Sequence, residues 1–401
     1  MKSLKLSIVL FLFVVSAVWI LPTACNQDTI PVTGISLNKS TTFLLVGKML
    51  VLDAVVEPAD ATNKTVTWNS NDNSIATINS AGEITGVAGG TVTITATTED
   101  GKFMATCTVT VIESSITMTT RGSWICFGIE ILEESENLTI DWGDGKKSKI
   151  TDAIRNNERW FSFCHEYQSA SERHITIGGV IIMDLSCGEN NLTALDVSRA
   201  TMLTSLDCEK NYITALDVSK NIALTYLNCQ YNQLTNLDVS GATALTYLNC
   251  SYNKLPALDV SRNTELTTLD CRRNKLTALN VSLNSTLSFL DCSTNQLNFL
   301  DLTYNSELVL LCLCYNGLTN LDVSANTMLL YLCCMFNNLT ANVLNDLFRT
   351  LPYIPGYGGW IEIWGNPGEH DCDRSIVDER GWKFDEDLHF SCQHTCWDEW
   401  R

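Results

Sequence analysis

Between residues 182 and 339 the chain repeats one pattern of hydrophobic and polar positions every 21 residues. Leucine holds one position of every repeat, at residues 185, 206, 227, 248, 269, 290, 311 and 332. Cysteine follows two positions later at residues 187, 208, 229, 250, 271, 292 and 334, and Leu313 replaces it once. Asparagine comes next, at residues 190, 211, 232, 253, 274, 295, 316 and 337. A repeat of constant length predicts a solenoid in which each coil packs against its neighbours.

Alternation of leucine and cysteine predicts one short strand per coil, with both side chains inward. Like residues then stack about 4.8 Å apart along the solenoid, the spacing between strands of a sheet. The asparagine amide has donors and an acceptor, so we expect it to bond backbone groups that the turn leaves without partners.

Each repeat also holds a weaker copy of the same pattern. Ile213, Leu216 and Val218 stand 11 residues before Leu224, Leu227 and Cys229. The half of the repeat that reads LDVS is therefore either a second strand or an extended turn. The unit L-x-x-L-x-C-x-x-N resembles the leucine-rich repeat, which implies eight 21-residue coils over residues 180–339.

The period ends at residue 340, and residues 340–401 are expected to form a cap and tail. Apolar positions between Val343 and Leu351 predict a helix, Ile361 and Ile363 point inward from a strand, and residues 375–384 form a short helix and strand. Such a segment closes the open end of a solenoid. Its "GNPG" and "GW" pieces resemble the closing segments of other surface leucine-rich-repeat proteins of gut bacteria.

Residues 31–113 alternate with period two in several short runs, among them "TVTITAT" and "CTVTV", separated by turn sequences such as "SAGE" and "EDGK". This pattern predicts a β-sandwich, with Trp68 in its core. The segment resembles the bacterial immunoglobulin-like group 2 domain along its whole length, which implies a spacer or adhesive module of a surface protein.

Residues 115–179 form another β-rich block. Its "WGDG" turn and later "HEY" are similar to the polycystic-kidney-disease-type sandwich. Asp141 and Asp144 either bind calcium or accept hydrogen bonds from turn amides. Cys126 and Cys164 lie in expected strands, where they either form a disulfide or stay apart. The fold class is thus mainly β and multidomain, with two β-sandwiches followed by a leucine-rich-repeat β-solenoid and an α+β cap.

The first residues read as an export signal. Lys2 and Lys5 precede an apolar run from Leu6 to Ile20, and "LPTAC" ends at Cys25. This resembles the lipobox of bacterial lipoproteins, which implies cleavage after residue 24, lipid on Cys25 and a linker to residue 30. An ordinary signal peptide and an uncleaved anchor are the alternatives. We expect a lipid-anchored protein of the bacterial cell envelope, on the outer membrane or cell surface, facing either the periplasm or the outside.

The chain is strongly acidic, with 26 basic and 45 acidic residues and a formal charge of −19. This charge argues against nucleic acid as a partner. One row of aspartates recurs with the 21-residue period and either binds a cation or bonds turn amides: Asp196, Asp217, Asp238, Asp259, Asp301 and Asp322, with Asn280 between.

Seventeen cysteines are many for an exported chain. In-register neighbours about 4.8 Å apart are slightly too far for disulfides, so we expect a ladder of buried thiols. Near the C-terminus either a disulfide staples the tail or zinc is bound, the candidates being His370, Cys372, His389, Cys392, His394 and Cys396.

No nucleophile motif, phosphate-binding glycine loop or HExxH motif occurs, so we expect a monomeric binding protein without a cofactor. Outward positions of the main sheet carry aromatic rings that suit contact with a protein or a glycan. A protein-binding or adhesion module is the first hypothesis, a glycan-binding lipoprotein the second and an enzyme the third. The predicted contact residues are Tyr226, Tyr247, Phe289 and Tyr331 in one column and Tyr231, Tyr252, Tyr315 and Phe336 in a flanking one.

Overall fold

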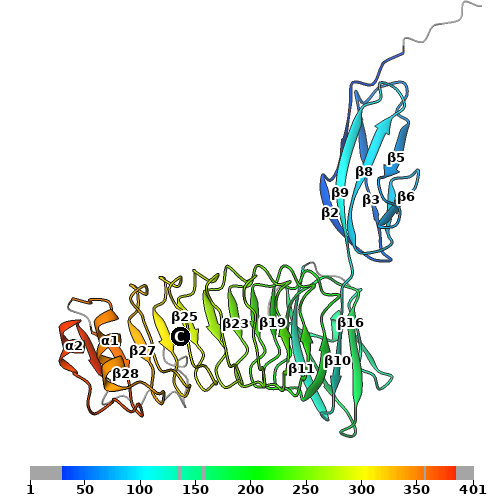
Figure 1. Cartoon of the computed structure of the whole chain (residues 1–401). Coiled ribbons are helices and arrows are strands. Elements are labelled where there is room, and N and C mark those ends of the chain that lie inside the picture. The colour runs from blue at the N-terminus through cyan, green and yellow to red at the C-terminus, as the bar shows by residue number, and fades with distance from the viewer. Residues whose placement is uncertain (1–28, 133–136, 156–158, 356–357, 385–401) are drawn as a thin grey trace, which may run out of the picture.

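The computed structural model describes residues 29–132, 137–155, 159–355 and 358–384. An Ig-like unit precedes a curved solenoid whose far end carries two helices (Figure 1). The predicted fold class is confirmed: the described chain is mainly β, with an Ig-like unit, a β-solenoid and a small helical part near the C-terminus. The expected signal peptide, Cys25, Cys392 and Cys396 lie outside the described residues.

The Ig-like unit is a sandwich whose larger sheet has the strand order β2-β9-β8-β5. Ile84, Ile94 and Val109 lie in its buried core, and Trp68 packs against this core while partly exposed. Its strands are β1 (Gly34–Leu37), β2 (Thr41–Leu45), β3 (Met49–Val51), β4 (Ala54–Glu57), β5 (Val66–Ser70), β6 (Ala76–Ile78), β7 (Glu83–Gly86), β8 (Gly90–Thr98) and β9 (Met104–Ile112).

The block after it forms two facing sheets that both continue into the solenoid. Strand β11 pairs with β15 on one side and with β17 of the first coil on the other, and β10 pairs with β18. The elements of this block are β10 (Ser115–Thr120), β11 (Trp124–Ile131), β12 (Thr139–Asp141), β13 (Lys147–Lys149), η1 (Ile150–Asp152), β14 (Ile154–Arg155), β15 (Trp160–Glu166) and β16 (Arg173–Gly178).

One hydrophobic cluster also runs from this block through the solenoid into the cap. The expected domain boundary between residues 179 and 180 therefore falls inside a continuous core. The sequence suggested a separate sandwich because it shows the change of period but not the strand pairing across it. The block covers the open N-terminal end of the solenoid, where the first coil otherwise has an unpaired edge.

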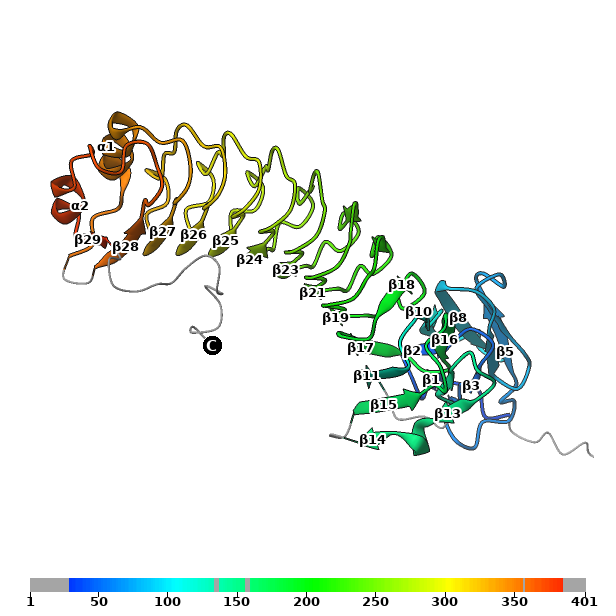
Figure 2. The ribbon, with the colours of Figure 1, turned by 90° about the horizontal axis from the view of Figure 1, so that it is seen from below.

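The solenoid builds one parallel sheet with a single short strand from each coil. Leu185 pairs with Leu206, and the same register continues by 21 residues per step to Leu332. The sheet follows the inner side of the arc (Figure 2), and we call its solvent-directed side the concave face. Its strands are β17 (Ile182–Ser186), β19 (Ser205–Asp207), β21 (Tyr226–Asn228), β23 (Tyr247–Asn249), β24 (Thr268–Asp270), β25 (Phe289–Asp291), β26 (Leu310–Cys312) and β27 (Tyr331–Cys333).

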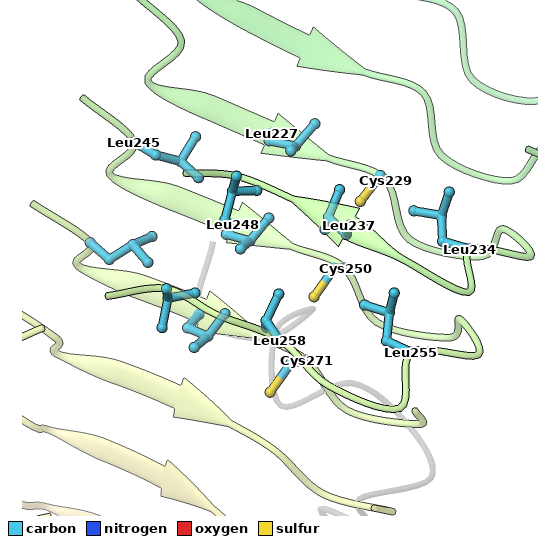
Figure 3. Packing of buried hydrophobic residues seen from close by; sticks show 14 of the residues in the cluster. Leu227, Cys229, Leu234, Leu237, Leu245, Leu248, Cys250, Leu255, Leu258 and Cys271 are labelled. Atoms are coloured by element: carbon cyan, nitrogen blue, oxygen red, sulfur yellow. The ribbon is translucent and has the colours of Figure 1, made fainter. Parts of the chain in front are cut away.

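The repeated leucines and cysteines point into the coil, as the alternation predicts. Leu227, Cys229, Leu248 and Cys250 are fully buried. Cys229, Cys250 and Cys271 lie one above another in successive coils (Figure 3). Like side chains thus fill the core in continuous rows.

The invariant asparagine joins successive coils. The Asn253 amide nitrogen donates to the carbonyl oxygens of Cys229 at 3.0 Å, Cys250 at 3.1 Å and Ser251 at 3.1 Å. Its amide oxygen accepts from the backbone N–H of Leu234 at 2.9 Å. One side chain therefore satisfies backbone groups of its own coil and of the preceding coil, as the sequence predicts.

The LDVS half of the repeat is a strand only in the first coils. β18 (Leu192–Asp196) pairs with β10, and β20 (Leu216–Asp217) pairs with β22 (Leu237–Asp238). From Leu258 onward the same residues form an extended turn. Both interpretations of this half therefore apply, each to a different part of the solenoid.

The cap agrees with its predicted elements. They are α1 (Ala341–Thr350), β28 (Gly359–Glu362), α2 (Ser375–Glu379) and β29 (Trp382–Phe384). β28 and β29 extend the solenoid sheet, and Leu344, Phe348 and Ile361 are fully buried. None of the helices in the described part of the chain is long and apolar enough to cross a bilayer.

We expect the Asn253→Ala variant to lower the free energy of unfolding by about 2–4 kcal/mol, because four hydrogen bonds vanish and leave buried backbone groups without partners. Urea unfolding followed by circular dichroism measures this loss. Lys254→Ala is the matched control, since this exposed side chain in the same coil donates only to Gln233. A loss at Asn253 no larger than at Lys254 contradicts the role given to the asparagine.

Candidate binding surface

A column of aromatic side chains stands on the concave face because the strands pair in register. Tyr226 pairs with Tyr247, and Phe289 and Tyr331 occupy the same position of later strands. The Tyr226 and Tyr247 rings stack with their centroids 4.5 Å apart and 10° between their planes. All four side chains are partly exposed. The Tyr226 and Tyr247 rings thus stack along the ladder and stay partly exposed.

The flanking column comes from one turn position of every coil. Tyr231 and Tyr252 have positive φ values of 52° and 54°, and Tyr315 and Phe336 have 55° and 50°. Non-glycine residues seldom adopt this left-handed backbone conformation. Because the same turn recurs in these coils, each ring occupies the same position in its coil. Tyr231 stacks on Tyr252 at 3.9 Å, and Tyr315 stacks on Phe336 at 4.4 Å. The Arg273 guanidinium lies 5.0 Å from the centroid of the Tyr252 ring.

A charged cluster separates the two halves of these columns. The Arg272 side chain lies between Asp270, with Nε 3.4 Å from Oδ2, and Asp291, with Nη1 3.3 Å from Oδ2. Both aspartates are almost fully buried. Burial raises the pKa of Asp270, the nearby Asp291 charge acts in the same direction and Arg272 opposes the shift. Sequence reasoning missed this cluster, although the single arginine at its position in the repeat was a signal.

The N-terminal end of the concave face is acidic. A cavity of about 490 Å³ there is lined by Trp160, Glu189, Asp207 and Glu209 among others. Burial raises the pKa of the neighbouring Asp184 to about 6; a hydrogen bond from Ser205 opposes this shift, and the charges of Glu130 and Asp207 add to it. The Lys210 Nζ lies 2.6 Å from Glu189 Oε1 and 3.4 Å from Glu209 Oε1, so this lysine offsets part of the acidic charge. The remaining excess of carboxyl groups favours positively charged groups of a partner.

The C-terminal end of the same face is apolar. Cys312, Cys314 and Cys333 form a cluster of their own, against which Leu310 and Met335 pack. All three cysteines are fully buried, as are Asp270 and Asp291 at the equivalent position of the two preceding coils. The concave face thus changes from acidic through aromatic to apolar along its length.

The two motif pieces of residues 115–179 meet in one network. The His165 ring stacks on Trp142 at 4.6 Å, its Nε2 lies 2.9 Å from Asp144 Oδ2, and the Tyr167 hydroxyl donates to the Trp142 carbonyl oxygen at 2.9 Å. Asp144 also accepts from the Lys146 amide and Asp141 from the Gly143 amide. Both carboxylates therefore bond turn amides, which is the second of the two interpretations given for them.

The aspartate row of the solenoid is also occupied by local hydrogen bonds. Each carboxylate accepts from the backbone N–H two residues later, for example Asp238 from Ser240 and Asp259 from Ser261, both at 2.9 Å. These bonds lower the pKa of both carboxyl groups, and their burial only partly opposes this. Among the described residues no group of three or more His, Cys, Asp or Glu side chains is arranged to hold a metal ion.

The described cysteines include a disulfide between two strands and a row of buried thiols in the solenoid. Cys126 and Cys164 face each other on paired strands and form a disulfide, which resolves the alternative that the sequence left open. Cys372 is a partly buried thiol, whereas its expected partners lie outside the described residues. Burial raises the pKa of the ladder thiols such as Cys208, Cys229 and Cys250, which makes them poor nucleophiles.

Comparison with known proteins identifies one family within the chain. The family model of the bacterial Ig-like domain (group 2) matches residues 31–109. An Ig-like virion protein of Serratia phage KSP90 is 48% identical over 83 residues, which are 20% of this chain and 32% of that protein. An alpha-L-arabinofuranosidase of Bifidobacterium longum subsp. longum is 48% identical over 79 residues, 20% of this chain and 7% of that enzyme. Relatives with glycosidase names match only the Ig-like domain, so the chain spans a small part of their length.

Two solved structures of Listeria monocytogenes proteins resemble about half of the chain. The functional domain of InlJ, described as including a cysteine ladder, is 35% identical with a TM-score of 0.40 and covers 49% of this chain and 47% of that one. The internalin InlF is 21% identical with a TM-score of 0.41 and covers 50% of this chain and 59% of that one.

In the native chain we expect a maleimide to leave the first six ladder thiols unlabelled, because burial both blocks access and raises their pKa. They are Cys187, Cys208, Cys229, Cys250, Cys271 and Cys292. After unfolding in guanidinium without reductant, peptide mass spectrometry should find all six labelled. The partly exposed Cys372 serves as the internal control that labels first. Disulfide-linked ladder peptides contradict this prediction.

Calcium should leave the thermal midpoint unchanged, because the aspartate row and the WGDG turn already use their carboxylates in local hydrogen bonds. The thermal unfolding midpoints in millimolar calcium and in a chelator should agree within about 1 °C. A ligand held tightly by the folded state would raise the midpoint by much more. A midpoint that rises with calcium concentration shows instead that one of these carboxylate groups binds the ion.

Proposed function

We propose that the concave face of the solenoid binds a protein partner and that the chain presents it from the bacterial cell envelope, anchored through lipid on Cys25. The observation that carries this proposal is the pair of aromatic columns, Tyr226 to Tyr331 on the strands and Tyr231 to Phe336 on the turns that follow them. Aromatic rings with few rotatable bonds lose little entropy on binding and dominate many protein interfaces.

The charge pattern favours a protein over a uniform polymer as the partner. The face offers an acidic cavity at Glu189 and Asp207, aromatic rings in its middle and an apolar end near Leu310. Such a surface is complementary to a partner that carries basic groups opposite the acidic zone, polar and apolar groups opposite the aromatic rings, and apolar groups opposite the apolar end. The Ig-like unit and the lipid then act as spacer and anchor, and the chain acts as a monomer.

A glycan ligand is the second candidate, and one observation favours it. Trp360 extends the Tyr331 column onto β28, and the nearby Trp364 is 63% exposed. Exposed indole rings provide stacking platforms for sugars. A glycan array probed with the full mature chain separates the two candidates, since a protein partner predicts no bound glycan. An enzyme stays the third hypothesis, and no group of three or more His, Cys, Asp or Glu side chains among the described residues suggests a metal centre for it.

The orientation of the anchored chain is tested on intact cells. Protease shaving should release peptides of the solenoid if the concave face is displayed outward. Recovery of those peptides only after cell lysis places the face in the periplasm and limits its partner to a periplasmic protein.

The Tyr226→Ala, Tyr247→Ala double variant should bind its partner at least about tenfold more weakly, because two stacked rings leave the middle of the face. The partner is first isolated with the full mature chain, and affinity is then measured by biolayer interferometry. Tyr304→Ala is the matched control, since Tyr304 is 61% exposed on a turn away from the sheet. Unchanged affinity in a double variant that still melts cooperatively removes the aromatic columns from the proposal.

A further inference from the structure

The flanking column takes one side chain from the turn of every coil, and one coil interrupts it. All of its members share a left-handed backbone, with φ between 50° and 60°. In chain order they are Glu189, Lys210, Tyr231, Tyr252, Arg273, Thr294, Tyr315 and Phe336. From Tyr231 onward each member carries an aromatic ring or a planar guanidinium group, except Thr294. We call this interruption the column break.

Planar groups stack on one another on both sides of the column break. Tyr231 stacks on Tyr252 with the ring centroids 3.9 Å apart, and the Arg273 guanidinium lies 5.0 Å from the Tyr252 centroid. On the other side Tyr315 stacks on Phe336, with 4.4 Å between the centroids and 11° between the planes. One stack therefore ends in a guanidinium group and the other in a phenol ring.

The column break has the width of one planar group. The strands β24, β25 and β26 pair in succession, so the turns that follow them carry Arg273, Thr294 and Tyr315 two strand spacings, about 9.6 Å, from first to last. A ring placed midway lies about 4.8 Å from each side, within the distances of cation–π contacts and ring stacking. The Thr294 side chain ends one bond beyond Cβ, which is too short to reach this place.

Solvent reaches the groups on both sides of the column break. Tyr315 is 36% exposed, and Arg273 and Thr294 are partly exposed. The nearby carboxylates of Asp270 and Asp291 pair with Arg272, the neighbour of Arg273 in the chain. A group that approaches from solvent can therefore contact both the guanidinium and the phenol ring.

The chemistry of the two sides favours an aromatic group between them. A cationic group is repelled by Arg273, and a carboxylate that pairs with Arg273 faces the negative side of the Tyr315 ring. An aliphatic group gains neither a cation–π contact nor ring stacking. An aromatic ring gains both, because its face attracts the guanidinium on one side and stacks on the phenol on the other.

We propose that the column break at Thr294 binds an aromatic side chain of the protein partner, which completes the stack between Arg273 and Tyr315. The inference rests on the proposed function, because it takes this surface as the contact with a protein. It adds the group that the partner places there, a phenyl, phenol or indole ring held in the middle of the flanking column.

A ring supplied by the chain itself tests the proposal. The backbone conformation at Thr294, with φ of 54°, carries tyrosine in three other coils, so the Thr294→Tyr variant should melt as cooperatively as the wild type. Because the introduced ring takes the place of the partner's ring, affinity for the partner in biolayer interferometry should fall at least about tenfold. Thr294→Ser is the matched control that leaves the column break open and should bind within about twofold of the wild type. Equal affinity of the two variants overturns the proposal.

The Arg273→Ala variant decides the case in which Thr294→Tyr does not fold. It removes one side of the column break and leaves the Thr294 turn unchanged, so affinity for the partner should fall at least about fivefold. Lys254→Ala removes the same charge from an exposed position and should bind like the wild type. Wild-type affinity of Arg273→Ala overturns the proposal.

A small aromatic probe separates a failure of this inference from a failure of the proposed function. Saturation-transfer NMR with millimolar N-acetyl-tryptophanamide should give indole signals with the wild-type and Thr294→Ser full mature chains, and signals at least about threefold weaker with Thr294→Tyr. This difference supports the column break as a site for aromatic rings even if no protein partner is found, in which case only the proposed function fails. Equal signals from the three chains overturn the inference, whichever partner the concave face binds.

Discussion

The structure depends on one repeated contact, the asparagine side chain that bonds backbone groups in two successive coils. Its amide group has the donors and the acceptor that a turn without helix or long strand leaves in need of partners. Asn253 shows the arrangement, since its nitrogen reaches carbonyl oxygens of two coils and its oxygen receives the Leu234 amide. Because this bonding requires one fixed separation along the chain, every coil has the same length.

Constant coil length has two consequences, one inside the solenoid and one outside. Inside, leucine lies over leucine and cysteine over cysteine, so the core is filled by rows of like side chains (Figure 3). Outside, side chains at one position of the repeat form columns, as Tyr226 and Tyr247 do. Constant coil length therefore gives a fully packed interior and an ordered outer surface. Side chains in these columns lose little conformational entropy when a partner binds.

A solenoid also needs closed ends, and the chain closes each end differently. At the N-terminal end the two sheets of residues 115–179 continue into the first coil through β11 and β10. At the C-terminal end α1 and α2 pack beside β28 and β29, which extend the sheet. One core runs from the first of these blocks to the last, so the described chain beyond the Ig-like unit behaves as a single packed body.

The sequence by itself determined the coils, their register and the residues in each column. The 21-residue period predicts which side chains stack, and the two-residue alternation predicts which side chains face inward. The Ig-like unit, the helix at 341–350 and the inward Ile361 followed from local pattern in the same way. Only the tertiary structure decided what depends on contacts between distant residues. Strand pairing joins the block of residues 115–179 to the first coil of the solenoid. Arg272 withdrew Asp270 and Asp291 from solvent by pairing with both. Period and alternation describe neighbours along the chain, whereas burial on the concave face depends on side chains from successive coils, as the pairing of Arg272 with Asp270 and Asp291 shows.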